Sequence, residues 1–224
     1  MIKDITMSLL EIKNVSKSFD MKGSSLQVIN DFNFTAEKGD LIALTGPSGA
    51  GKSTLLHIIG GLDKPTKGNV IFNNIDIYNM KETELNIYRG KNMGFVFQFH
   101  YLLDDFTAIE NIMIPMLIHN VSKRDAEKRA EELIKSVCLY ERRNHYPSEL
   151  SGGEQQRIAV ARALSNKPEI ILADEPTGNL DKSNSLAVLD ILKQQAENGV
   201  CVIIVTHDEY IAAECKKHIV MQKL

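Results

Sequence analysis

The stretch "DLIALTGPSGAGKSTLLHIIGGL", residues 40–62, decides the fold. The segment "DLIALT" predicts a buried strand, and "STLLHIIGGL" predicts a helix that ends in glycines. Between them, residues 46–53 fit the pattern G-x-x-x-x-G-K-[ST]. A glycine loop between a strand and a helix is a P-loop, in which several backbone N–H groups face the phosphates of a nucleotide. The sequence therefore predicts an α/β nucleotide-binding domain.

Two side chains of the loop add to this phosphate site. Lys52 supplies a positive charge for the outer phosphates. The Ser53 hydroxyl suits Mg²⁺, a hard cation that prefers oxygen ligands. We expect the nucleotide-binding residues to be Gly46, Pro47, Ser48, Gly49, Ala50, Gly51, Lys52, Ser53 and Thr54.

Polar residues also follow three other predicted strands. "NMGFVFQ" ends in Gln98, "EIILADEP" contains Asp174 and Glu175, and "VIIVTH" ends in His207. If these strands and the one before Gly46 lie in one parallel sheet, their carboxyl ends meet at one edge. Asp174 is then placed to hold Mg²⁺, directly or through water. Glu175 is placed to orient or deprotonate a water that attacks the γ-phosphate.

Gln98 and His207 each allow two interpretations. Gln98 could contact Mg²⁺ or the attacking water, and His207 could donate a hydrogen bond to the γ-phosphate. Alternatively, neither has a catalytic role: Gln98 is then an ordinary surface amide, and His207 is a packed or exposed ring. Spacing alone does not choose between them.

A second anion-binding pattern stands at "LSGGEQQ", residues 150–156. A serine at the N-cap and bare backbone amides at a helix start attract anions. The same residues also fit a flexible helix cap. Because the chain already has a P-loop, the purpose of a second phosphate site is not evident from these residues alone.

The chain changes character twice along its length. "LLEIKNVSKSF" and "LQVINDFNFTAE" predict two antiparallel strands joined by a turn at residues 23–25. From residue 99 to 165 strand patterns give way to helical ones, such as "SKRDAEKRAEELIKSV" with its capping box at Ser122 and Asp125. Apolar strands that alternate with helices indicate a parallel sheet covered on both faces. We therefore predict a nucleotide-binding core, 1–98 and 166–224, with a helical segment inserted at 99–165.

Composition narrows the classes of function. The formal net charge of −3 over 224 residues gives no general attraction to nucleic acid. The three cysteines, Cys138, Cys201 and Cys215, form no C-x-x-C pair, so neither a zinc site nor a disulfide framework is predicted. Apolar stretches fall well short of the roughly 20 residues that span a membrane. Any link to a membrane is expected to come through a partner.

The motifs together resemble a known family. The P-loop, Gln98, "LSGGEQ", "ILADEP", "NLD" and "THD" occur in the order seen in ATP-binding-cassette (ABC) ATPases, and the resemblance covers nearly the whole chain. It implies an α/β fold: a P-loop NTPase (RecA-like) parallel-sheet core, an N-terminal antiparallel β subdomain and an inserted α-helical subdomain. It also implies a homodimer that binds ATP and Mg²⁺ and hydrolyses the ATP.

The resemblance assigns a purpose to the second anion site. In that family two subunits pack head to tail, and each signature closes over the ATP held by the other subunit's P-loop. The signature residues here are Ser151, Gly152, Gly153 and Glu154. By the same matching, Asp181 lies in a loop that crosses between subunits beside Glu175. Phe19 would stack on adenine, although tyrosine is more usual there.

Within the family, "GFVFQFHYLLDDFTAIENIMIPMLI" and "ADEPTGNLD" are most similar to the ATPase subunits of bacterial lipoprotein-releasing complexes. Macrolide-exporter and cell-division cassettes share much of this pattern, and "SGGEQQR" departs from the "SGGERQR" expected of the lipoprotein type. The resemblance implies a peripheral protein at the cytoplasmic face of the inner membrane that powers integral membrane permease subunits. An apolar cluster after Gln98 either docks that partner or packs under the helical segment: Phe99, Tyr101, Leu102 and Leu103.

Two other classes of function are disfavoured. A soluble cassette that works on ribosomes carries two cassettes in one chain, and one that works on chromosomes inserts a long coiled coil between P-loop and signature. Here only residues 53–150 separate Lys52 from Ser151. A small-molecule kinase shares the P-loop but has no use for "LSGGEQ".

Overall fold

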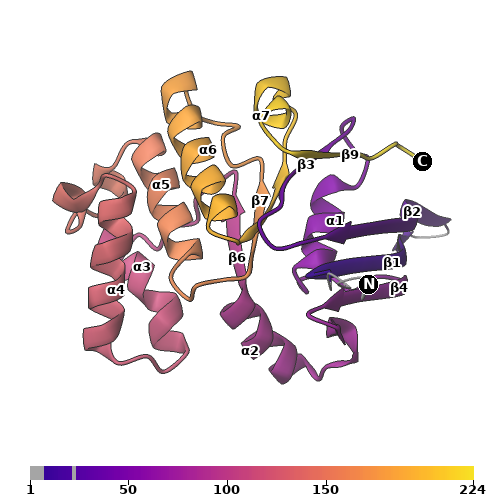
Figure 1. Ribbon diagram of the computed structural model, residues 1–224, viewed down its shortest axis with the longest axis horizontal. Coiled ribbons are helices and arrows are strands. Elements are labelled where there is room, and N and C mark those ends of the chain that lie inside the picture. Colours follow the sequence, from indigo (N-terminus) through magenta and orange to yellow (C-terminus); the bar gives the residue numbers. More distant parts are fainter. Residues whose placement is uncertain (1–7, 22–23) are drawn as a thin grey trace, which may run out of the picture.

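The computed structural model describes residues 8–21 and 24–224, whose strands form two sheets (Figure 1). The first sheet is antiparallel, with the order β2-β1-β4-β5. Its strands are β1 Leu10–Met21, β2 Ser24–Ala36, β4 Lys67–Phe72 and β5 Ile75–Asp76. The second sheet is parallel throughout, with the order β6-β7-β8-β3-β9. Its strands are β3 Leu41–Thr45, β6 Met93–Phe97, β7 Ile170–Asp174, β8 Cys201–Val205 and β9 Lys217–Val220.

Seven α-helices cover these sheets in the described part of the chain. They are α1 Lys52–Ile59, α2 Glu82–Asn92, α3 Ala108–Ile118, α4 Lys123–Ser136, α5 Gly152–Ala163, α6 Lys182–Glu197 and α7 Glu209–Ala213. Figure 1 shows α3, α4 and α5 side by side at one end of the molecule and the antiparallel sheet at the other, with the parallel sheet between them. None of the helices in residues 8–21 and 24–224 is long and apolar enough to cross a membrane.

The parallel sheet separates two hydrophobic cores. Successive side chains of a strand point to opposite faces. In β3, Leu41 and Ala43 join one core, whereas Ile42 and Leu44 join the other. β7 and β8 alternate in the same way. This explains why these strands are apolar throughout, as the sequence indicated.

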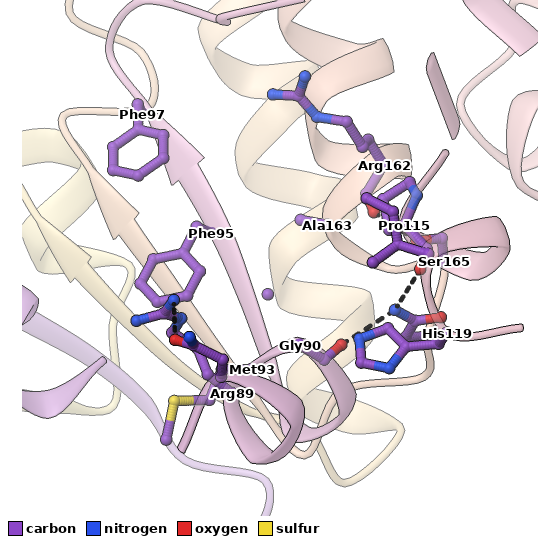
Figure 2. Close-up of a pocket in the computed structure, with 14 residues that line it drawn as sticks. Arg89, Gly90, Met93, Phe95, Phe97, Pro115, His119, Arg162, Ala163 and Ser165 are labelled. Atoms are coloured by element: carbon purple, nitrogen blue, oxygen red, sulfur yellow. Dashed lines mark hydrogen bonds between the residues drawn. The ribbon is translucent and has the colours of Figure 1, made fainter. Parts of the chain in front are cut away.

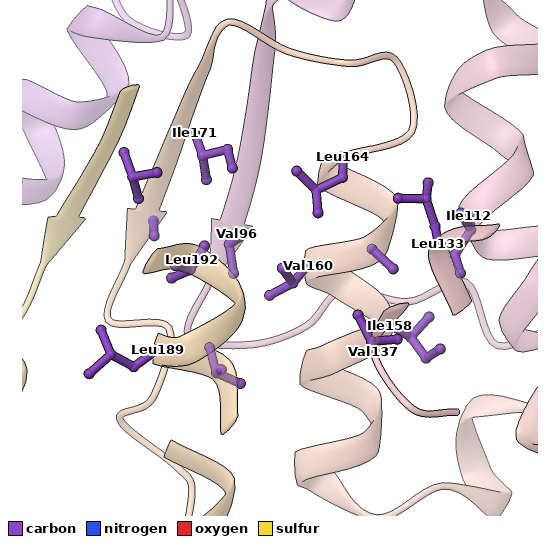
Figure 3. Close-up of a cluster of buried hydrophobic side chains, with 14 of the residues drawn as sticks. Val96, Ile112, Leu133, Val137, Ile158, Val160, Leu164, Ile171, Leu189 and Leu192 are labelled. Atoms are coloured by element: carbon purple, nitrogen blue, oxygen red, sulfur yellow. The ribbon is translucent and has the colours of Figure 1, made fainter. Parts of the chain in front are cut away.

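The helices α3, α4 and α5 share their core with one face of the parallel sheet. Figure 3 shows Val96 and Ile171 of the sheet facing Val160 of α5 and Leu164, which directly follows that helix, with Ile112 of α3 and Leu133 of α4 beyond them. In α4 the buried residues are Ala126, Ala130, Leu133 and Ile134, the spacing of an amphipathic helix. Ser122 caps this helix by accepting a hydrogen bond from the Asp125 N–H at 3.2 Å.

The predicted fold class is confirmed: a parallel-sheet core, an antiparallel sheet from the N-terminal strands, and a block of helices. The predicted strands that flank residues 23–25 form β1 and β2. Gly23 itself lies outside the described residues.

Candidate active site

Four strand ends meet at one edge of the parallel sheet. β6, β7, β8 and β3 are consecutive neighbours, so the residues that follow them lie along the same edge. In the register, Asp174 pairs with Phe97 on one side and with Val205 on the other. The predicted gathering of Gly46, Gln98, Asp174 and His207 at this edge is therefore confirmed.

The P-loop between β3 and α1 has a backbone that demands glycine. Gly46, Gly49 and Gly51 have φ angles of 141°, 79° and 88°, in the region that side chains rarely adopt. A Cβ atom on Gly46 would lie only 2.3 Å from the Met221 carbonyl oxygen. The loop borders a cavity of about 460 Å³, which is lined by Leu26, Val28, Ser48, Gly49, Gly51, Lys52, Ser53, Thr54, Glu175 and Val205.

Lys52 and Ser53 begin helix α1 and point their polar atoms at the loop and at β7. The Lys52 ammonium donates to the carbonyl oxygens of Gly46 at 2.9 Å and Pro47 at 3.0 Å. An ammonium has three donors, so one more can serve an anion. The Ser53 hydroxyl donates to Asp174 Oδ1 at 3.0 Å. A hydroxyl and a carboxylate from segments 121 positions apart thus lie side by side.

Glu175 is held in a strained position next to His207. Its φ angle of 48° is left-handed, which costs a non-glycine residue about 1–2 kcal/mol. Its N–H donates to the Val205 carbonyl at 2.9 Å, and its Oε2 lies 2.9 Å from His207 Nδ1. The Glu175 side chain is 18% exposed and the His207 side chain 72%. Strain of this kind persists only where the surroundings fix it, and such places are often functional.

Gln98 follows β6 and contacts the loop after β7. Its Nε2 donates to Asn179 Oδ1 at 3.3 Å. A Cβ atom on Gly178 would lie 3.0 Å from the same nitrogen, so the loop passes closely over the amide. Gln98 is therefore neither a free surface amide nor part of the core.

Phe19 is not among the residues that line the P-loop cavity. It pairs across the hairpin with Leu26, which does line it. The Phe19 ring is 40% exposed, and the Lys17 ammonium lies 4.8 Å from its centroid. The sequence did not single out Leu26, because an alternating strand does not show which of its faces borders a cavity.

The predicted signature residues form the start of helix α5. Ser151 is the N-cap: its Oγ accepts from the Glu154 N–H at 3.3 Å, and its N–H donates to Glu154 Oε2 at 2.8 Å. The Ser151 N–H bond is the main reason that the pKa of the Glu154 carboxyl is lowered. Glu154 thus caps its own helix, and it also lies 3.4 Å from Arg142 Nε.

The two signature glycines have different surroundings. A Cβ atom on Gly152 would meet nothing within 4 Å, whereas one on Gly153 would lie 2.2 Å from Asn184 of α6. Gly152 is exposed and Gly153 is buried. Glycine is therefore required at 153 by packing, which no local sequence signal reveals, because Asn184 comes from a distant segment.

Asn184 connects the signature helix with Asp181. The Asp181 carboxylate caps α6, accepting from the Asn184 N–H at 2.9 Å and from Asn184 Nδ2 at 2.7 Å. Arg157 of α5 donates to Asn184 Oδ1 at 2.7 Å. The two segments predicted to face a partner subunit are thus joined within one chain.

Comparison with known proteins identifies the family. The ABC transporter family matches residues 29–178, a range that contains the P-loop, Gln98, Ser151 and Glu175. The chain belongs to the ABC transporter family. This ABC transporter ATPase is 46% identical over 212 residues to the lipoprotein-releasing system ATP-binding protein LolD of Syntrophus aciditrophicus, covering 94% of this chain and 95% of the relative. It is 48% identical over 207 residues to LolD of Geobacter metallireducens, covering 92% of each.

Solved ABC cassettes have the same fold. A dimeric structure of the ATP-binding cassette MJ0796, bound to ADP and Pi after hydrolysis, superposes with a TM-score of 0.87 at 38% identity, covering 96% of both chains. Another dimeric structure of that cassette gives a TM-score of 0.88 at 39% identity, covering 95% of this chain and 94% of the other.

Proposed function

We propose that this ABC transporter ATPase is the ATP-hydrolysing subunit of a bacterial complex that releases lipoproteins from the inner membrane. The observation that carries the proposal is the identity of 46% and 48%, over more than nine-tenths of the chain, to lipoprotein-releasing system ATP-binding proteins. Macrolide-exporter and cell-division complexes are the alternatives.

In this proposal the cavity at the P-loop holds the triphosphate of ATP. The backbone N–H groups at the start of α1 and the Lys52 ammonium are arranged to balance its negative charge. Phe19 or Leu26 borders the adenine, and both lie on the hairpin next to the cavity. Leu26 lines the cavity directly, so it is the stronger contact for an apolar purine face.

Three side chains at this edge of the sheet carry oxygen atoms that suit a magnesium ion. They are the Ser53 hydroxyl, the Asp174 carboxylate beside it and the amide of Gln98, and Mg²⁺ prefers oxygen ligands. Among the residues that the structure describes, no cluster of three or more histidine, cysteine, aspartate or glutamate side chains could hold a metal. One carboxylate is enough for Mg²⁺, because it usually keeps water and phosphate ligands. When bound, the ion neutralises charge on the phosphate oxygens.

Glu175 orients the water that attacks the γ-phosphate and takes its proton. Its strained backbone and its contact with His207 fix the carboxylate at the edge of the cavity. A neutral histidine has only one N–H. If that N–H is on Nδ1 and faces Glu175, Nε2 carries no hydrogen in the neutral ring. Nε2 can then donate to the γ-phosphate only when the ring is protonated, or a donor can reach the phosphate after the ring rotates.

The signature of one subunit closes over the ATP of another in a head-to-tail homodimer. Ser151 Oγ and the exposed N–H of Gly152 stand at the open start of α5, where the helix dipole favours an anion. Asp181 approaches the partner with them, since Asn184 joins the two segments. The dimeric form of the cassette MJ0796 supports this arrangement.

A groove beside the segment after Gln98 is the proposed docking place for the membrane subunits. A cavity of about 350 Å³ lies between α2, β6, α3 and α5, with Phe95, Phe97, Pro115 and Arg162 on its walls (Figure 2). Pro115 and Arg162, which belong to the helical segment predicted at 99–165, form one of its sides. Placed there, the ATPase would lie peripherally on the cytoplasmic face of the inner membrane.

Some residues of the apolar cluster after Gln98 suit docking of the membrane partner, and one packs under the helical segment instead. Phe99, Tyr101 and Leu103 are 58%, 64% and 46% exposed, which suits a docking surface. Leu102 packs against the core. Arg162 holds the backbone of this segment by donating to the carbonyl oxygens of His100 at 2.7 Å and Tyr101 at 2.6 Å.

Depletion of the protein in its native bacterium tests the function. We expect lipoproteins to accumulate in the inner membrane, and the wild-type protein to co-purify with an integral membrane protein. Greater macrolide sensitivity with normal lipoprotein localisation would favour the exporter, and a division defect alone would favour the cell-division complex. Tyr101→Glu should abolish co-purification but not ATP binding, whereas Ile75→Glu, 46% exposed on the antiparallel sheet, should retain both.

A further inference from the structure

A buried glutamine of helix α5 contacts two of the three strand ends that carry the proposed catalytic groups, those of β6 and β7. The Gln156 side chain is 1% exposed. Its Nε2 donates to the carbonyl oxygens of Phe97 at 2.9 Å and Pro176 at 2.8 Å. Phe97 precedes Gln98, and Pro176 follows Glu175. One amide nitrogen thus bridges two backbone segments at the active site, from a helix that begins at the signature serine.

The chemistry of the partners fixes the orientation of the amide. Both are carbonyl oxygens, which only accept hydrogen bonds, so the nitrogen of Gln156 must face them. Its Oε1 is buried and has no hydrogen-bond partner within residues 8–21 and 24–224. A buried polar group that is only partly satisfied stabilises a core less than an apolar side chain does. Packing alone therefore does not favour glutamine at this position, whereas the two bonds to the active-site backbone do.

We propose that Gln156 is a positioning residue for ATP hydrolysis. It couples the signature helix, which faces the partner's ATP, to Gln98 and Glu175, which face the chain's own ATP. Movement of α5 on closure then moves both strand ends with it. The inference rests on the roles proposed for Gln98, Glu175 and the signature.

The required precision explains why two hydrogen bonds matter. Glu175 has a left-handed backbone next to Pro176, and its carboxylate must meet a water in line with the γ-phosphate. A misplacement of about 1 Å in such a site can lower the rate about 100-fold. Loss of the Gln156 hydrogen bonds removes a restraint on the backbone at Pro176, next to Glu175, and at Phe97, next to Gln98.

Gln194 provides a control for the substitution. It is an exposed glutamine near the C-terminal end of α6, and it belongs to neither the P-loop nor the signature. Methionine has nearly the same length as glutamine and no amide. We expect Gln156→Met to lower kcat roughly 10- to 100-fold with KM for ATP changed less than about twofold. Gln194→Met should keep kcat within about twofold of the wild type.

Thermal unfolding shows whether each variant is folded. If Gln156→Met does not fold, Gln156→Asn keeps an amide that is too short to bridge both carbonyls, and the same loss of kcat is expected. A folded Gln156 variant with the kcat of the Gln194→Met control would overturn the inference. In a Gln98→Ala background the effect of Gln156→Met should be smaller than in the wild type, and effects that simply multiply would contradict positioning through Gln98.

The Glu175→Gln variant separates failure of this inference from failure of the site assignment. If it keeps normal turnover, the catalytic assignment itself is wrong. If it loses turnover while Gln156→Met and Gln194→Met have the same kcat, only the role of Gln156 is wrong.

Discussion

The P-loop and the start of helix α5 are both suited to anions, yet the first is enclosed by its own chain and the second is open. The P-loop has three glycines with positive φ, a lysine and a cavity of about 460 Å³. At the start of α5, Ser151 and Gly152 are exposed, and a Cβ atom on Gly152 would meet nothing within 4 Å. The charged residue in the first turn of α5 is Glu154, an anion.

This difference explains why one chain carries two such sites. The P-loop supplies both amides and a cation, so it can bind a phosphate by itself. The start of α5 supplies amides and a hydroxyl but carries a carboxylate. It therefore suits a phosphate whose negative charge is already balanced by cationic groups of another subunit. A triphosphate held in a second subunit's P-loop meets that condition.

The largest expected effect is a loss of turnover at the P-loop site. Glu175→Gln should lower kcat by about 10²–10⁴-fold, because the carboxylate that positions the water and accepts its proton is lost. ATP binding should persist and trap a dimer. Phosphate release measures the first effect, and size-exclusion chromatography with light scattering measures the second. Glu197→Gln, on the exposed end of α6, should behave as wild type.

The second-largest expected effect is a loss of ATP affinity when the positive charge of Lys52 is removed. Lys52→Ala should weaken ATP binding about 10- to 100-fold, the worth of a charge-assisted hydrogen bond of about 1.5–3 kcal/mol. Titration calorimetry measures the affinity. Lys91→Ala, at the exposed end of α2, is the control. An unchanged affinity in Lys52→Ala would remove the P-loop from the account.

Substitutions of the two signature glycines, Gly152 and Gly153, test the start of α5. Gly153→Ala should destabilise the isolated subunit by about 1–3 kcal/mol, because its Cβ would overlap Asn184. Gly152→Ala should leave the stability of the subunit within about 0.5 kcal/mol of wild type, or raise it slightly, as expected in a helix. It should still impair turnover if the partner's ATP approaches that amide. Denaturant unfolding and phosphate release together test this, and equal destabilisation by both variants would refute the packing role.

The smallest expected effect concerns pH. The folded-state pKa of Glu154 is lowered, chiefly by the Ser151 N–H. The associated stability is therefore fully present above pH 4.5, the ordinary pKa, and is lost as the pH falls through the lowered folded-state value. Glutamine at this position keeps an oxygen for the capping box but does not titrate. The stability difference between wild type and Glu154→Gln should shrink on acidification, and a difference that grows would contradict the assignment.

Much of the fold was predictable because local patterns agreed with the tertiary structure. The strands β3, β7 and β8 are buried on both faces and therefore read as apolar runs. Two helices were not predicted individually. α2 has no buried residue and thus no apolar stripe, and α3 contains Pro115, which normally argues against a helix. The boundaries of the helical segment at 98/99 and 165/166 stay predictions.

The candidate site was predictable where spacing is local and not where it depends on distant packing. The P-loop and the polar strand ends follow from motif and topology. The packing of Gly153 on Asn184, the bridge made by Gln156 and the cavity contact of Leu26 join segments far apart in sequence, so no local pattern shows them. The roles of Phe19, Ser151 and Asp181 stay predictions.

Cross-linking between mixed subunits tests most directly whether the signature caps a partner's ATP. Two forms of the Glu175→Gln protein carry Ser48→Cys or Ser151→Cys, each with Cys138→Ser, because Cys138 is exposed while Cys201 and Cys215 are buried. A short thiol cross-linker should join the two forms only when they are mixed, and only with ATP. An ATP-dependent dimer that forms without this cross-link would contradict the account.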